Sequence, residues 1–370
     1  MLADGLGSQL YDADVQRQYQ ARYAGRVGTL YTHPPFEAAL YLAVAWLPLR
    51  YAYLLWSFLS MALTAASAIL LTREALSPWS WRVVLVASLT FVPSLVCVIQ
   101  GQDSLLLLWF VVLAFTALRR GRGFAAGCWL ALGLFKFQLV LPLVLVLVLT
   151  QRSSRAGLAK GFSLTALALA GVSVAISGWS VLTLYPNFLL HFHEQPLGGI
   201  APGGMANFRG LAYFLFHRDG DHWIIAAVSI LSLAALLTTL RGWKHAQKEF
   251  RQEPSGNVNY EFDLAFANTV LFALLVSYHL NPHDLALLLL SILLLLHCAR
   301  VQTQHPPRPA QWMTFSLMGI LFLPPLHLWA LTARAYDIVG IPVFLLFLTS
   351  AVLKLIAPTT SLGKATTIQG

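Results

Sequence analysis

The residues with the clearest potential for chemistry lie in one short polar stretch, Ser277–Asp284, between two long apolar runs. It contains His279, His283 and Asp284. A histidine can bind a phosphate oxygen as a cation or exchange protons near neutral pH, and His together with Asp could bind a metal ion. A structural interpretation is also open, because Asp284 can cap the next helix and Asn281 suits a turn. The stretch predicts contact with a substrate phosphate, with a structural turn and a metal site as alternatives.

Two further polar positions interrupt apolar sequence. Lys136 is the only Lys or Arg inside a long apolar run, residues 123–150. It could supply a point charge for a phosphate, or it could extend from a hairpin tip to the membrane interface. Asp103 follows Gly101 and Gln102 and begins a predicted helix. It could cap that helix, or it could contact substrate or act as an acid or base.

The region 180–222 is rich in polar residues and glycine, and we predict a loop there. Asn207 and Arg209 could hold a sugar or a phosphate. The sequence His191-Phe192-His193-Glu194 could bind a metal ion, but one short motif is weak evidence, so we predict no metal site and no cofactor. The glycines do not form a P-loop, because the Gly-Lys-Ser/Thr ending and the preceding strand are missing.

The composition excludes an ordinary soluble protein. Of 370 residues, 58% are hydrophobic and only 11% are charged, whereas a soluble globular protein has about 25% charged residues. Many apolar runs are close to 20 residues long, which predicts an all-α, polytopic membrane protein with 10–12 membrane helices. The net charge of +9 does not indicate nucleic acid, because Lys and Arg accumulate in the cytoplasmic loops of membrane proteins.

The apolar segments must position these polar residues. The expected helices are roughly 51–72, 83–99, 104–118, 123–150, 161–179, 223–240, 262–279, 285–299, 311–331 and 339–355. Residues 36–47 would be about 18 Å long as a helix, too short for a hydrocarbon core of about 30 Å. The run 123–150 contains Pro142, which favours either two short helices that dip in and return or one long kinked helix.

The basic residues predict the orientation. If 123–150 is a hairpin and 36–47 does not span, 16 of the 24 Lys and Arg residues share one side, which is then cytoplasmic. The polar residues discussed above fall on the other side of a plasma membrane. The amino-terminal segment would also be outside with no helix to carry it across, which predicts a further helix upstream. The predicted divisions of this single domain are an outer loop 1–35, helices 36–179, an outer loop 180–222, helices 223–356 and a cytoplasmic tail 357–370.

Several short motifs, taken in order, resemble glycosyltransferase family 87. They cover nearly the whole chain: Gly7–Asp12, Tyr31-Thr32-His33-Pro34-Pro35-Phe36, Leu47-Pro48, Leu55-Trp56, Gly101-Gln102-Asp103-Ser104, Ala126-Gly127 with Lys136 and Pro142, and Ser277-x-His279. The resemblance implies a fold-C membrane glycosyltransferase. Such an enzyme moves a hexose, with mannose the first expectation, from a polyprenyl-phosphate donor to a lipid or glycan acceptor on the outer face.

The resemblance also implies which residues serve the site. An Asp at the outer end of the first family helix acts as the base, and the expected position of this Asp lies upstream of Met1. The catalytic residue is therefore unassigned, with Asp103 a weak candidate, because typical members have Asn at that position. The residues expected to contact the donor are His33, Gln102, Lys136, His279, His283 and Asp284, together with Asn207 and Arg209 from the residue analysis.

Two other functions stay open at this point. A transporter or lipid flippase would use broken helices, which only the 123–150 run suggests, and the sequence has no detectable inverted repeat. A non-catalytic relative would account for the missing acidic base.

Overall fold

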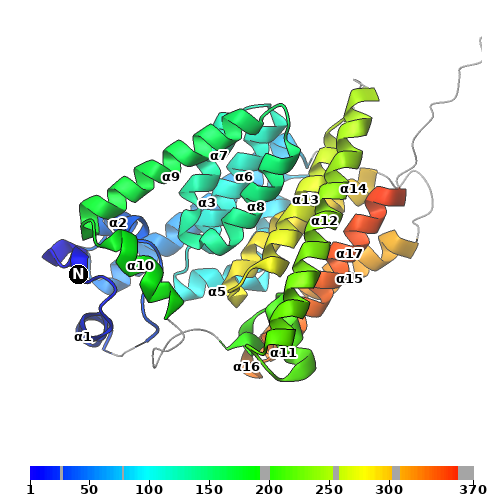
Figure 1. Ribbon diagram of the computed structural model, residues 1–370. Helices are drawn as coiled ribbons and strands as arrows, with labels where there is room; N and C mark the ends of the chain where they lie inside the picture. The colour runs from blue at the N-terminus through cyan, green and yellow to red at the C-terminus, as the bar shows by residue number, and fades with distance from the viewer. Residues whose placement is uncertain (26–27, 77–78, 192–200, 253–257, 302–308, 357–370) are drawn as a thin grey trace, which may run out of the picture.

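The protein is helical throughout the part that the computed structural model describes, residues 1–25, 28–76, 79–191, 201–252, 258–301 and 309–356 (Figure 1). The predicted all-α class is confirmed. The first half contains α1 (Ala13–Ala24), α2 (Pro35–Leu42), α3 (Leu49–Glu74), α4 (Trp81–Thr90), α5 (Val92–Gln100), α6 (Ser104–Arg119), α7 (Gly123–Leu132), η3 (Leu134–Lys136), α8 (Phe137–Thr150) and α9 (Arg155–Ser177). The 3₁₀ turns η1 (Leu2–Asp4) and η2 (Gly7–Gln9) precede α1.

The second half continues the bundle. Its elements are α10 (Val181–Leu190), η5 (Pro202–Gly204), α11 (Phe208–Phe216), α12 (His222–Gln252), α13 (Val258–Val276), η6 (Pro282–Leu287), α14 (Leu288–Val301), α15 (Pro309–Phe322), α16 (Pro324–Thr332), η7 (Tyr336–Val339) and α17 (Gly340–Ile356). The region 180–222, predicted as a loop, therefore contains two short helices. Residues 192–200 of that region and the predicted tail 357–370 lie outside the described residues.

Several helices are long and apolar enough to cross a membrane. Within the described ranges four qualify singly, and up to seven qualify if each of three bent pairs is one span. The single ones are Leu49–Glu74, Arg155–Ser177, His222–Lys244 and Pro282–Ala299. This count is below the predicted 10–12, because several apolar segments are bent or are shorter than a bilayer requires. Helix α2 has 8 residues and cannot span, as predicted for that piece.

The run 123–150 dips in and returns. Its two helices meet at a break with an angle of 62°. Gly123, at the start of α7, lies close to Ser154, a few residues after the end of α8. A Cβ atom added to Gly123 would lie only 2.5 Å from the carbonyl oxygen of Ser154. The beginning of α7 and the end of α8 therefore lie at the same end of the bundle. Lys136 sits at the tip of this hairpin, at the opposite end.

The hairpin packs against α9 through glycine. Gly127 on α7 faces the backbone of Leu158, and a Cβ atom on Gly127 would lie 2.2 Å from the Leu158 carbonyl oxygen. Gly161 on α9 faces the backbone of Phe124, and a Cβ atom on Gly161 would lie 2.1 Å from the Phe124 carbonyl oxygen. Small residues allow such close backbone approach, which drives helix association where lipid gives no hydrophobic force between helices. This contact fixes the depth of the hairpin tip.

The core lies among α6, α8, α13 and α14. Phe115 and Phe266 are fully buried there, with ring centroids 5.0 Å apart. Apolar side chains elsewhere point outward, such as Leu167 on α9 (68% exposed) and Ile230 on α12 (67% exposed). An exposed apolar face on a long helix indicates contact with lipid.

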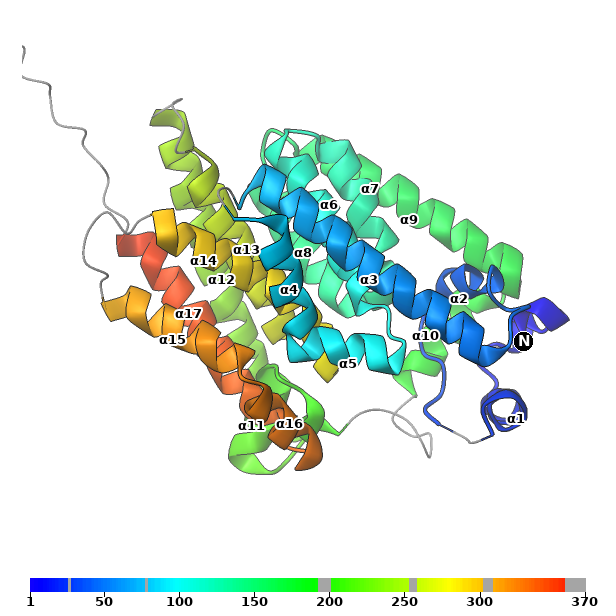
Figure 2. The same cartoon turned by 180° about the vertical axis from the view of Figure 1, so that it is seen from behind.

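The two ends of the bundle differ. At one end, Arg120 after α6 pairs with Glu74 at the end of α3, and Arg119 lies 3.2 Å from Asp263 near the start of α13. The other end, called here the site end, contains α2, α5, η3, η6 and the first residues of α6. In Figure 1, helices α11 and α16 lie at the lower edge of the molecule and the last turns of α12 lie at the upper edge. Figure 2 shows α5 running across the end of α4.

Candidate active site

The site is built around the buried ammonium group of Lys136. Only 1% of this residue is exposed, so the alternative of a lysine extending to the interface is wrong. Its Nζ lies 2.8 Å from Asp103 Oδ1 and 2.8 Å from Asp284 Oδ1. A buried charge is tolerated when it is paired and hydrogen-bonded. Lys136 therefore joins three segments that are far apart in sequence.

Asp284 is held by its own turn as well. Its Oδ2 accepts a hydrogen bond from the backbone N–H of Asn281 at 2.9 Å, and Oδ1 accepts one from the hydroxyl of Ser104 at 2.9 Å. Pro282 starts η6 and presets the backbone angle that this turn requires. The structural alternative for Ser277–Asp284, a capped turn, is thus present, and it places one carboxylate oxygen against Lys136.

Asp103 occupies the N-cap position of α6 without making a side-chain capping bond. Gly101 ends α5 with φ at 65°, a left-handed conformation that favours glycine, and this turns the chain toward α6. The carboxylate instead faces Lys136 through Oδ1 and His33 through Oδ2, which lies 3.2 Å from His33 Nδ1. Burial alone would raise the pKa of Asp103, but the charge of Lys136 and the contact with His33 outweigh burial and lower it.

Glu37 is a site residue that the sequence analysis missed. It lies on α2, is 2% exposed, and its Oε2 is 3.1 Å from His33 Nδ1. The hydroxyls of Tyr31 and Tyr41 donate to its two oxygens at 2.7 Å and 3.1 Å. Two signals pointed to it: an acidic residue in the short apolar piece after His33, and the i,i+4 spacing from that histidine.

His33 lies between the two carboxylates and is partly exposed, with 25% of its side chain accessible. Burial by itself would lower its pKa, but hydrogen bonds and charges from Asp103 and Glu37 dominate and raise the pKa to about 9. His33 is therefore a cation at neutral pH. Burial raises the pKa of Glu37, although His33 acts against it. A carboxylate with a raised pKa suits proton transfer near neutral pH better than one with a lowered pKa.

The first residues of the chain pack against α2, the helix that carries Glu37. The Met1 carbonyl oxygen accepts hydrogen bonds from the N–H groups of Asp4 and Leu6 at 3.1 Å and 3.0 Å, and these bonds close the turn η1. This turn contacts α2. The role of an Asp upstream of Met1 as the base stays a prediction. Glu37 is an acidic residue that the structure places in this cluster.

Three ligand atoms in this cluster could hold a metal ion. One atom each from His33, Glu37 and Asp103 lie within 4.8 Å of one another. A carboxylate of this group already faces the ammonium of Lys136. The predicted alternative of a metal at His191 and His193 is not supported at His191, whose Nδ1 lies 2.8 Å from the Asn187 carbonyl oxygen, and His193 lies outside the described residues.

The other predicted residues surround this cluster. Nδ1 of His283 lies 2.9 Å from Gln100 Oε1, and its Nε2 lies 3.7 Å from Asp284 Oδ1. His279 is partly buried on the turn, and burial lowers its pKa, so it is neutral at neutral pH. The carbonyl of Gln102 accepts from Trp56 Nε1 at 3.4 Å. Gln102 thus has a backbone contact at the entrance to α6.

Asn207 and Arg209 support the turn from a separate helix. Asn207 is fully buried; its Oδ1 accepts from the Gly210 N–H at 2.8 Å and its Nδ2 donates to the Ser277 carbonyl at 2.6 Å. Arg209 pairs with Asp219 and lies 4.5 Å over the ring of Tyr278. Asn207 therefore contacts the backbone of the Ser277–Asp284 turn at Ser277, and Arg209 contacts the side chain of Tyr278 in the same turn.

The fold and the cluster define a class: a polytopic helical membrane protein with buried ionisable groups gathered at one end. The model of glycosyltransferase family 87 matches residues 31–277, about two thirds of the chain, and the protein belongs to that family. The match begins at Tyr31, beside the cluster. No curated protein and no solved structure matches the chain.

Proposed function

We propose that this membrane glycosyltransferase moves a hexose, mannose being the first candidate, from a polyprenyl-phosphate donor to a lipid or glycan acceptor. The donor is inferred from the chemistry of the cluster: a sugar that leaves from a phosphodiester needs a cation for the phosphate and a base for the incoming hydroxyl. His33 and Glu37, with His33 Nδ1 at 3.1 Å from Glu37 Oε2, supply these two groups side by side. This pair is the observation that carries the proposal.

The roles follow from exposure and charge. His33 is the cationic member of the cluster with an accessible side chain, so it is the candidate to stabilise the leaving phosphate. Glu37 is the candidate base, because its pKa is raised while that of Asp103 is lowered. Lys136 holds Asp103 and Asp284 in place, and a direct contact between Lys136 and phosphate stays a prediction.

The turn residues complete the proposed donor site. His279 and His283 precede Asp284 in the Ser277–Asp284 turn, and a neutral imidazole can donate a hydrogen bond to a phosphate or to a sugar hydroxyl. The positive-inside rule favours the extracytoplasmic face of a plasma membrane for this end, because Arg119, Arg120 and Arg155 gather at the opposite end.

The test uses membranes from cells that express the full chain, supplied with polyprenyl-phosphate-mannose that carries a radiolabel in the sugar. We expect label in a lipid or glycan product. Glu37→Gln should lower the rate about 100-fold or more if Glu37 is the base, and His33→Ala should also lower it strongly.

Matched controls separate chemistry from folding. Glu74→Gln removes a carboxylate at the opposite end of the bundle, and His222→Ala removes an exposed histidine at the start of α12 that does not line the cluster; both should transfer label at the parental rate. Equal amounts of folded protein are confirmed by size-exclusion chromatography. Full activity in Glu37→Gln would refute its role as base, and the absence of transfer by the parent from any polyprenyl-phosphate hexose would refute the proposed donor.

A further inference from the structure

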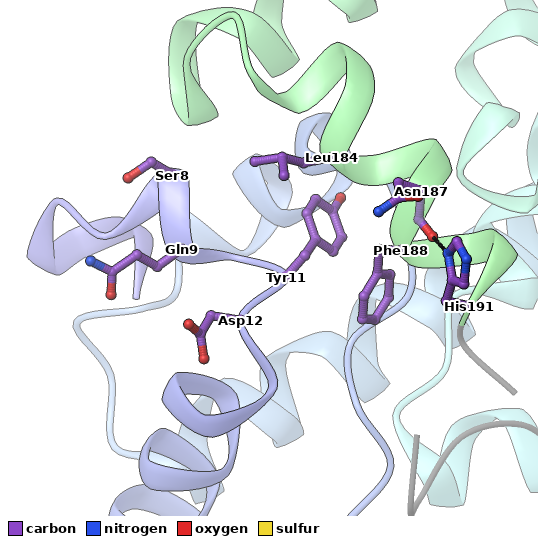
Figure 3. Close-up of a pocket in the computed structure, with 8 residues that line it drawn as sticks. All are labelled: Ser8, Gln9, Tyr11, Asp12, Leu184, Asn187, Phe188 and His191. Carbon is purple, nitrogen blue, oxygen red and sulfur yellow. Dashed lines mark hydrogen bonds between the residues drawn. The ribbon is translucent and has the colours of Figure 1, made fainter. Parts of the chain in front are cut away.

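A cavity of about 390 Å³ lies between the amino-terminal segment and α10, beside the cluster (Figure 3). It is lined by Ser8, Gln9, Tyr11, Asp12, Leu184, Asn187, Phe188 and His191. This volume is within the range of about 300–1,000 Å³ that is usual for small-molecule sites. Figure 3 shows side chains from both segments facing this space.

The lining combines an aromatic wall with hydrogen-bonding groups. The rings of Tyr11 and Phe188 are 5.1 Å apart. Ser8, Gln9 and Asn187 add hydroxyl and amide groups that can donate and accept. A saccharide ring matches this lining, because its C–H face packs on aromatic carbons while its hydroxyls reach amide and carboxylate groups.

The charges disfavour a phosphate in this cavity. Among the described residues that line the cavity there is no Lys or Arg, and Asp12 contributes a carboxylate, one oxygen of which accepts from the backbone of α1 at 2.9 Å. An anionic ligand would be repelled by this negative charge, and the described lining residues offer no Lys or Arg to offset it. The sugar-phosphate part of a donor is therefore expected to bind near the cationic side chain of His33, whereas the cavity is expected to bind a neutral group with many hydroxyls.

The cavity is joined to the cluster by direct hydrogen bonds. The Tyr11 hydroxyl donates to the backbone carbonyl of His33 at 2.8 Å, and the Tyr185 hydroxyl donates to that of Thr32 at 3.2 Å. The aromatic wall thus positions the segment that carries His33 into the site. We propose that the cavity binds a sugar ring of the acceptor, next to the reacting groups. This inference rests on the proposed function and names its acceptor as a saccharide.

Saturation-transfer NMR tests the sugar site directly. The full chain is placed in phosphatidylcholine nanodiscs, with no glycosidic detergent, and methyl α-D-mannopyranoside is the probe. We expect saturation of the sugar ring protons by the parent protein. In Phe188→Ala the signal should fall about fivefold or more, since an aromatic contact of this size is lost.

Three further variants make this result specific. Tyr11→Phe keeps the ring and should keep the signal, whereas Tyr11→Ala should lose it. Tyr23→Ala removes a 57% exposed aromatic residue of α1 that does not line the cavity, and it should behave as the parent. An equal signal in the parent, Phe188→Ala and Tyr11→Ala would overturn the proposal.

A second arm separates acceptor from donor. Hydrolysis of polyprenyl-phosphate-mannose by water, measured without an acceptor, should be unchanged in Phe188→Ala. If hydrolysis falls as far as sugar binding does, the cavity holds the donor sugar and the acceptor assignment is overturned. If the parent does not turn over the donor but shows Phe188-dependent sugar binding, the proposed function fails and the saccharide site is supported.

Discussion

The ammonium group of Lys136 lies 2.8 Å from the carboxylate of Asp284, although helices α8 to α13 separate these two residues in the sequence. The same Nζ lies 2.8 Å from Asp103. One ammonium group thus pairs with two buried carboxylates and links the hairpin tip to α6 and η6. Loss of this charge is more costly than loss of an exposed ion pair, because water cannot solvate the buried partners in its place.

Lys136→Met should therefore destabilise the protein strongly. Asp284 would be left buried without the ammonium group, and Asp103 would keep only His33 as a cationic partner, at a cost of about 3–5 kcal/mol. The measurement is thermal unfolding of the detergent-solubilised protein. It is monitored as the loss of the monodisperse peak in size-exclusion chromatography after heating. Lys160→Met, at an exposed position on α9, should have little effect. Adding Asp284→Asn to Lys136→Met should recover part of the loss; a further decrease in stability would contradict the ion-pair account.

Asn207→Ala should loosen the Ser277–Asp284 turn. The change removes the cap of α11 and leaves the Ser277 carbonyl without its buried donor, which together cost about 1–3 kcal/mol. Hydrogen exchange measured by mass spectrometry should show faster exchange in the turn. Gln18→Ala, an exposed amide on α1, is the control. Unchanged exchange in the turn of Asn207→Ala would show that Asn207 does not hold it.

Gly127→Ala should displace the hairpin. Its new methyl group would lie 2.2 Å from the Leu158 carbonyl oxygen, a distance that only a shift of α7 from α9 relieves. We expect lower thermal stability and loss of transfer activity. Gly171→Ala places a methyl group on α9 where no atom lies within 4 Å, and it should be neutral or slightly stabilising. Equal stability of the two variants would argue against close packing of α7 on α9.

The stability and activity of the protein should decline as pH rises toward 9. The pKa of His33 is raised from 6.5 in the unfolded chain to about 9 in the fold. A raised pKa means that its contribution to stability is fully present below pH 6.5 and is lost as pH rises through about 9. The same deprotonation removes the proposed phosphate cation. The profile of kcat/KM against pH should fall on the alkaline side, and His33→Gln should flatten that limb at a lower overall rate.

The sequence indicated several residues that the fold brings together, but not the contacts that each of them makes. His33, Asp103, Lys136 and Asp284 stand out because ionisable groups are costly beside apolar sequence, and the structure brings these four together. Glu37 was missed because its significance comes from two tyrosine hydroxyls and a histidine that converge on it. Asn207 was expected to touch substrate, yet its amide is engaged by Gly210 and Ser277.

What the sequence determined by itself is the class of protein. Long apolar segments predict helices that cross a bilayer, because in lipid the backbone N–H and C=O groups of a segment must form their hydrogen bonds within that segment. The run 123–150 shows the limit: its length allowed a kinked helix or a hairpin, and close contact with α9 through Gly127 and Gly161 decided for the hairpin. Only tertiary structure paired Lys136 with two carboxylates rather than with the interface, since burial and charge neutralisation depend on segments far apart in the chain.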